Sequence, residues 1–177
     1  MKKIFILALT IVMAGTMAAC GAGDVGRTSS ASTSSQAASS SAVSSQAPSA
    51  DASSYDDSLD GLEKYLTVSG LISGNPSDMQ ASFIGAEKGA RYQFGLNGKD
   101  NVSVELYEFN TNSLNSDAQK VLNDVKANGS FTIMNKKVDA IISDSGKYIM
   151  IYKDTVTNDE NKQRQEKTIK LFKEFKK

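Results

Sequence analysis

The sequence predicts an α+β fold, a two-layer sandwich in which helices pack on one face of an antiparallel sheet. Three observations in residues 55–177 support this prediction. Apolar residues recur every three or four positions in some segments, they alternate with polar residues in others, and short polar turns join neighbouring alternating segments. The elements are expected in the order ααββαβββα. Hairpins joined to helices favour antiparallel pairing, with the helices gathered on one face.

The first two expected helices precede the sheet. Leucines spaced three and four residues apart predict a helix over residues 58–69, and Gly70 ends it. A second, shorter helix is expected to follow. Asn75 suits its cap, Pro76 fits its first position and Gly85 ends it.

Alternating residues predict the strands. A hairpin is expected over residues 92–106, turned by Asn97-Gly98, because both residues tolerate the positive φ of a type I′ turn. A longer loop that includes residues 99–101 is the alternative. A short strand over 131–134 and a hairpin of 138–143 with 147–153 follow. The last of these strands is apolar on both faces, which is typical of a central strand.

Two further helices complete the expected order. Residues 116–127 carry a continuous apolar stripe and are followed by Asn128-Gly129, a common stop signal. The final helix is predicted to begin with a capping box, in which Thr157 caps and Glu160 returns the hydrogen bond. Its buried stripe is Ile169, Phe172 and Phe175, with lysines on the remaining surface.

The N-terminus has the pattern of a secretory signal peptide. Two lysines precede an apolar stretch from Ile4 to Val12, and small residues follow as far as Cys20. The apolar stretch is shorter than the ~20 residues that a spanning helix requires.

The end of this segment, Met17-Ala18-Ala19-Cys20, resembles the lipobox of bacterial lipoproteins, with Met17 where that family usually carries Leu. The resemblance implies cleavage before Cys20, a thioether-linked diacylglycerol on its sulfur and an N-acyl chain as a further modification. Two or three acyl chains anchor far more firmly than one. The expected location is therefore the extracytoplasmic face of the cell membrane, most readily of a Gram-positive cell.

Three regions are expected along the chain: residues 1–19 as the signal, 20–54 as the lipidated Cys with a Ser/Ala-rich tether, and 55–177 as one globular domain. The tether is poor in large apolar residues, so it buries too little surface to offset its ordering entropy. The whole layout is similar to small domains of unassigned function on Gram-positive lipoproteins.

Composition excludes several function classes. There is no His and one Cys among 177 residues, so imidazole-based catalysis, an internal disulfide and a Cys-rich metal site are all excluded. Lys plus Arg and Asp plus Glu are each 20, and this balance provides no global field for nucleic acid. No metal or non-covalent cofactor is expected. The Ser145-Gly146-Lys147 triplet is interpreted as a hairpin turn, and no SxxK motif opens a helix in the domain.

Five residues are the candidate binding surface. Tyr107 and Phe109 are expected on the opposite strand face from the alternating apolar residues, and Tyr148, Met150 and Tyr152 on a face that could align with them. Tyr and Met on an open sheet suit recognition of a protein, peptide or glycan. The alternative is that all five are core residues beneath a helix.

The sequence thus predicts a membrane-anchored binding or interaction module rather than an enzyme, with a protein, peptide or glycan of the cell envelope as its partner. Two alternatives stay open. One is a small envelope hydrolase that uses carboxylates or a Ser-Lys pair, and the other is an accessory lipoprotein of a transporter.

Overall fold

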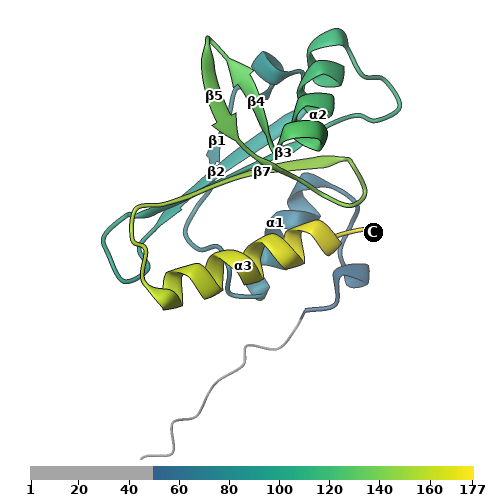
Figure 1. Ribbon diagram of the computed structural model, residues 1–177. Coiled ribbons are helices and arrows are strands. Elements are labelled where there is room, and N and C mark those ends of the chain that lie inside the picture. Colours follow the sequence, from purple (N-terminus) through teal and green to yellow (C-terminus); the bar gives the residue numbers. More distant parts are fainter. Residues whose placement is uncertain (1–49) are drawn as a thin grey trace, which may run out of the picture. The chain divides into compact units, whose positions relative to one another are not determined.

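The computed structural model describes residues 50–177 (Figure 1). The signal segment, the lipobox with Cys20 and most of the expected tether lie outside the described residues. The helical elements are η1 (Ala52–Ser54), α1 (Leu59–Val68), η2 (Ala81–Ile84), α2 (Ser116–Asn128) and α3 (Asp159–Glu174), where η marks a 3₁₀ helix. The strands are β1 (Ser77–Asp78), β2 (Lys88–Phe94), β3 (Val102–Glu108), β4 (Ser130–Ile133), β5 (Lys136–Asp139), β6 (Ile141–Ile142) and β7 (Tyr148–Asp154).

The α+β sandwich with an antiparallel sheet is confirmed. Five strands form the main sheet in the order β1-β2-β3-β7-β6, and β4 and β5 form a separate two-stranded ribbon. All neighbouring strands pair antiparallel. The strand that is apolar on both faces, β7, lies between β3 and β6, as expected of an interior strand.

Both faces of the main sheet are covered. On one face, α1 and α3 pack over a core that includes Leu62, Val104 and Phe172. On the other face, η2, α2 and the β4–β5 ribbon cover a second core, in which Phe109 and Ile149 are fully buried. Figure 1 shows α1 and α3 on one side of the sheet and α2 with the ribbon on the other. The second face therefore has a covering layer that the periodicity of single segments does not reveal.

The expected second helix, from Asn75 to Gly85, is largely wrong. Residues 77–78 instead pair with Arg91 and Ala90 as the edge strand β1, and the Met79 amide donates to the Gly89 carbonyl at 3.0 Å. Only η2 is helical, and it ends at Gly85 with φ 73°. Pairing with the sheet edge satisfies backbone groups that a short isolated helix would leave to water.

The loop between β2 and β3 is the longer alternative. Phe94 pairs with Val102, so residues 95–101 connect the strands. Asn97 has φ 56° but Gly98 does not lie in the positive region, and the two-residue type I′ turn does not form. The Asn101 side chain holds the loop closed, because it accepts from the Leu96 amide at 2.9 Å and donates to the Leu96 carbonyl at 3.0 Å.

The cap of the final helix lies one residue later than expected. Asn158 is the N-cap, and its side chain accepts from the Asn161 amide at 2.8 Å. Glu160 does not return a bond to Thr157 but accepts from the Asn97 side chain at 2.8 Å. An Asn one position along offers the same acceptor, which leaves Glu160 free to tie the helix to the β2–β3 loop.

The folded domain begins before residue 55. Asp51 caps η1 through the Ser53 amide at 2.9 Å, and Ala50 and Ala52 pack against the core beneath α1 and α3. Residues 50–54, which the composition assigns to the tether, therefore belong to the domain. Lys176 donates to the Ser53 carbonyl at 3.3 Å, so the start of the domain lies beside its C-terminus.

Candidate functional site

The five aromatic and methionine residues predicted as a binding surface are buried and do not share a face. Tyr148, Met150 and Tyr152 lie in the core under α1 and α3, whereas Tyr107 and Phe109 lie in the core under α2. The most exposed of the five, Tyr152, shows 8% of its surface. The prediction of an open aromatic patch is therefore wrong, and the alternative of core residues holds.

Strand register explains the separation. Leu106 pairs with Met150 and Glu108 pairs with Tyr148, so the β7 tyrosines point to the same side as the apolar residues of β3. Tyr107 instead pairs with Ile149 and points the other way. A shift of one residue in register would have brought the two groups together, and the sequence of a single strand does not fix that register.

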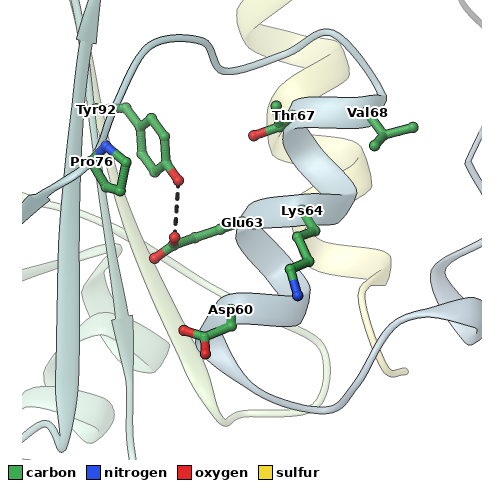
Figure 2. A pocket seen from close by; sticks show the side chains of 7 residues that line it. All are labelled: Asp60, Glu63, Lys64, Thr67, Val68, Pro76 and Tyr92. Atoms are coloured by element: carbon green, nitrogen blue, oxygen red, sulfur yellow. Dashed lines mark hydrogen bonds between the residues drawn. The ribbon is translucent and has the colours of Figure 1, made fainter.

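A groove lies between α1 and the β1–β2 edge of the sheet. One part of it, about 380 Å³ in volume, is drawn in Figure 2 and is lined by Asp60, Glu63, Lys64, Thr67, Val68, Pro76 and Tyr92. A second part, about 390 Å³, shares Asp60, Glu63 and Pro76 with the first and continues along β1 and β2. The continuation adds Leu59, Asp78, Met79, Lys88, Gly89 and Ala90. Because the two parts share three residues, we describe them together as the α1–β2 groove.

The helical wall of the groove follows from the sequence of α1. Leu62, Tyr65 and Leu66 face the core and are buried. Their neighbours Glu63, Lys64 and Thr67 line the groove. Ser58 caps the helix by accepting from the Gly61 amide at 3.2 Å. The buried carboxylate of Glu108, at the end of β3, also accepts from the Leu59 amide at 2.9 Å. These two bonds fix the start of α1 and hence the position of its outward side chains.

The opposite wall comes from β1 and β2. Pro76 precedes the two paired residues of β1, and it can take an edge position because it has no amide hydrogen to donate. Tyr92 of β2 is 4% exposed, and its ring belongs to the core while its hydroxyl reaches the groove. Figure 2 shows Tyr92 and Glu63 pointing toward each other from the two walls.

Glu63 has an unusual electrostatic environment. The Tyr92 hydroxyl donates to its Oε2 at 2.9 Å. Burial raises the pKa of Glu63 despite this hydrogen bond, and the nearby charges of Asp60 and Asp78 raise it further. The same contact, with burial as the larger cause, raises the pKa of Tyr92. The charge of Lys88 lowers the pKa but does not outweigh burial. The groove therefore holds a half-buried carboxylate that has one hydroxyl donor and no ion-pair partner within residues 50–177.

Two other polar clusters of the domain are internally satisfied. Lys147 of the Ser145-Gly146-Lys147 triplet pairs with Glu108 at 3.1 Å and with Asp57 at 3.3 Å. The turn itself closes through the Gly146 amide and the Ser143 carbonyl, which agrees with its interpretation as a hairpin turn. This cluster joins the loop before α1 to the ends of β3 and β7 and is a structural clamp.

A second satisfied cluster surrounds Asp154. Its carboxylate accepts from Asn101 at 2.7 Å, from Asn161 at 2.6 Å and from the Val156 amide at 2.8 Å. Burial opposes the charge, but these hydrogen bonds outweigh it and lower the pKa of Asp154. The network ties the end of β7 to the β2–β3 loop and to α3, so Asp154 has no free oxygen turned toward a ligand.

Comparisons of the chain with protein-family models, with curated proteins and with solved structures find no match. Within residues 50–177, no group of three or more potential ligands is placed to hold a metal ion. No helix in that part of the chain has the length and apolar character needed to cross a bilayer.

Sequence reasoning missed the groove. Asp60 appears in the sequence only as one of several acidic residues at a helix start, and Glu63 and Tyr92 are far apart along the chain. The one available signal is that Glu63 lies between the buried leucines of α1 and β1 follows a proline. Neither signal indicates that these segments become neighbours.

Proposed function

We propose that this protein is a lipid-anchored binding module of the extracytoplasmic face, and that the α1–β2 groove holds its ligand. The lipobox-like Met17-Ala18-Ala19-Cys20 supports the anchor. The single observation that supports binding is the groove itself, which is concave, partly apolar and lined by carboxylates without ion-pair partners among the described residues.

The size and composition of the groove suit a small group or one segment of a peptide. Binding sites for small molecules commonly measure about 300–1,000 Å³ and combine apolar walls with a few convergent polar groups. Each part of the groove is at the lower end of that range. The groove is open at the surface, so a longer ligand can extend beyond it.

A photocrosslinking experiment on the membrane-anchored protein tests the binding role. A photoreactive residue replaces Thr67 in the groove, and in a matched variant it replaces Thr132, an exposed residue of β4 on the other side of the sheet. We expect a discrete crosslinked species in intact cells from position 67 and none from position 132. Equal crosslinking at both positions, or none at either, would contradict the groove as the binding surface.

The anchor has its own test. Mass spectrometry of the protein isolated from its native cells is expected to show an N-terminal peptide beginning at Cys20 with diacylglycerol on the sulfur. A secreted chain with an unmodified thiol would refute the anchor and leave the groove to be judged by crosslinking alone.

A small envelope hydrolase is the second candidate, and Glu63 is the observation that favours it. A carboxyl group whose pKa is raised by burial and by neighbouring carboxylates is a pattern of general acid catalysis. Asp60 and Glu63 project from the same helix, which disfavours them as a pair, because the paired carboxylates of glycosidases face each other across the substrate. Asp78 of β1 is the carboxylate on the opposite wall and would be the second member of such a pair. Release of product from envelope polymers by the wild type, but not by Glu63→Gln, would favour this candidate over binding.

A further inference from the structure

We propose that the α1–β2 groove binds an alkylammonium group, that is, a primary ammonium on an aliphatic stem. The inference rests on the proposed binding function and names its ligand class. Such a group comes either from a lysine side chain of a peptide or from a free diamine, and both sources present the same chemistry to the groove.

Charge complementarity is the first argument. Asp60, Glu63 and Asp78 line the groove, and no Lys or Arg nitrogen in residues 50–177 lies within ion-pair distance of any of them. Elsewhere in residues 50–177, carboxylates such as Glu105 and Glu108 have such partners, whereas exposed ones such as Glu166 do not. Glu63 differs from the latter because it is half-buried. Lys64 and Lys88 also line the groove, but neither reaches these carboxylates, so a bound cation would supply the ion-pair partner that residues 50–177 do not.

The geometry of Glu63 is the second argument. Its Oε2 accepts from the Tyr92 hydroxyl, and no hydrogen bond within the described residues involves Oε1. The side chain is half-buried, so its charge is poorly solvated when the groove is empty of ligand. An ammonium donor at Oε1 would stabilise the ionised carboxylate and would lower the pKa of Glu63 on binding.

The apolar lining favours an aliphatic stem. Val68 is 55% exposed and lines one part of the groove. Pro76 and the Tyr92 ring line the same part, and Ala90 lines the continuation. A chain of methylene groups can lie along this surface while its charged end reaches Glu63.

Ammonium fits the groove better than guanidinium. A guanidinium group binds best when one carboxylate meets its planar fork, whereas an ammonium is a point charge with three rotatable donors. The carboxylates of the groove are spread over α1 and β1. This arrangement suits a point charge better than a planar group that must meet a single carboxylate. Inorganic cations are disfavoured because the described residues hold no metal-ligating group of three.

Two lysines in the groove provide an internal control. Lys64 and Lys88 line it, both are exposed, and both would repel an ammonium ligand. Removing either charge should therefore strengthen binding, whereas it would weaken the binding of an anionic ligand. The sign of this effect separates the proposed ligand class from its opposite.

The experiment is isothermal titration calorimetry of the full 177-residue chain in a non-ionic detergent. The probes are pentylamine, 1,5-diaminopentane and N-acetyl-lysine amide, with 1-pentanol as the uncharged control. We expect the amines to bind and pentanol not to bind at the same concentrations. Binding should weaken as salt is added, because exposed charges are screened. Tighter binding of the lysine amide indicates a peptide source, and tighter binding of the diamine a free one.

Variants make the assignment specific. Glu63→Gln keeps an acceptor for the Tyr92 hydroxyl and should weaken amine binding about tenfold, the effect of one charge-assisted hydrogen bond. Glu166→Gln makes the same chemical change on an exposed residue of α3 that has no ion-pair or hydrogen-bond partner within residues 50–177, and it should leave the affinity unchanged. Lys64→Gln should strengthen binding. Asp78→Asn, in the exposed strand β1, provides a second test if Glu63→Gln does not fold.

Two results would overturn the inference. The first is amine binding no tighter than that of pentanol, and the second is equal affinity in the wild type and in both groove-carboxylate variants. If crosslinking at position 67 persists in either case, the groove binds another class of ligand and the proposed function stands. If crosslinking also fails, both proposals fall.

Discussion

Glu108 fixes the start of α1, so replacing it tests how the groove is held in place. Glu108 is 7% exposed at the end of β3. One carboxylate oxygen accepts from the Leu59 amide at 2.9 Å, and the other pairs with Lys147 at 3.1 Å. Glu108→Ala removes both contacts at once and leaves Lys147 with Asp57 as its remaining partner.

The expected cost follows from these two contacts. A hydrogen bond to a charged group contributes about 1.5–3 kcal/mol. A fully buried ion pair that loses one partner costs about 3–5 kcal/mol, and an exposed one less than about 1 kcal/mol. The Lys147–Glu108 pair lies between these limits, because the side chains are 21% and 9% exposed and Lys147 keeps Asp57. We therefore expect Glu108→Ala to lower the free energy of unfolding by about 3–4 kcal/mol.

Urea unfolding followed by circular dichroism measures this change, with Glu166→Ala as the matched control. The control residue is exposed and should change stability by less than about 0.5 kcal/mol. Hydrogen exchange should also accelerate selectively at the first amides of α1 in the Glu108 variant. A loss below about 1 kcal/mol, the range of a surface pair, would refute the argument that Glu108 holds α1 in place.

Three further predictions concern the core, a tight turn and the groove. Phe109→Ala should lower the unfolding free energy by about 3–5 kcal/mol in urea, since Phe109 is fully buried, whereas Val68→Ala at an exposed position should be nearly neutral. Gly85→Ala should lower the free energy of unfolding by about 2–3 kcal/mol, because φ is 73° and the new methyl would press on the cap of α2. Gly146→Ala should lower it by only about 1 kcal/mol, because φ is 74° but the space around the new methyl is open. Equal losses in thermal unfolding of the two alanine variants would show that the cap contact is unimportant. Burial raises the pKa of Glu63, so the folded state binds the carboxyl proton more tightly than the unfolded state does. The free energy of unfolding should therefore fall as pH rises from 4.5, the ordinary pKa of a glutamate, through the raised pKa of the folded state. Glu63→Gln should lack this component of the pH profile, and an unchanged profile would contradict the burial argument.

Local patterns in the sequence were sufficient for the three long helices. The stripes of α1, α2 and α3 are properties of single segments, and each helix forms within a residue or two of its expected range. The burial of β7 on both faces could also be predicted, because the residues from Tyr148 to Tyr152 are apolar on both faces of the strand. These features depend on spacing within one element, which the sequence displays directly.

Features that depend on how elements pack against one another could not be predicted from the sequence. Asn75 and Pro76 are as suitable for a helix start as for a sheet edge, and only pairing with β2 decides between them. The relative register of β3 and β7 placed Tyr107 and Tyr148 on opposite faces, and that register is set by cross-strand packing. The groove could not be predicted for the same reason, because Glu63 and Tyr92 become neighbours only when α1 packs on the sheet.

The most direct test of the account is an NMR titration of the ¹⁵N-labelled full chain with 1,5-diaminopentane. We expect saturable shifts at the amides of residues 60–68, 77–79 and 88–92, the walls of the α1–β2 groove. Shifts confined to the ribbon at residues 130–139, or no saturable shift at any amide, would contradict it.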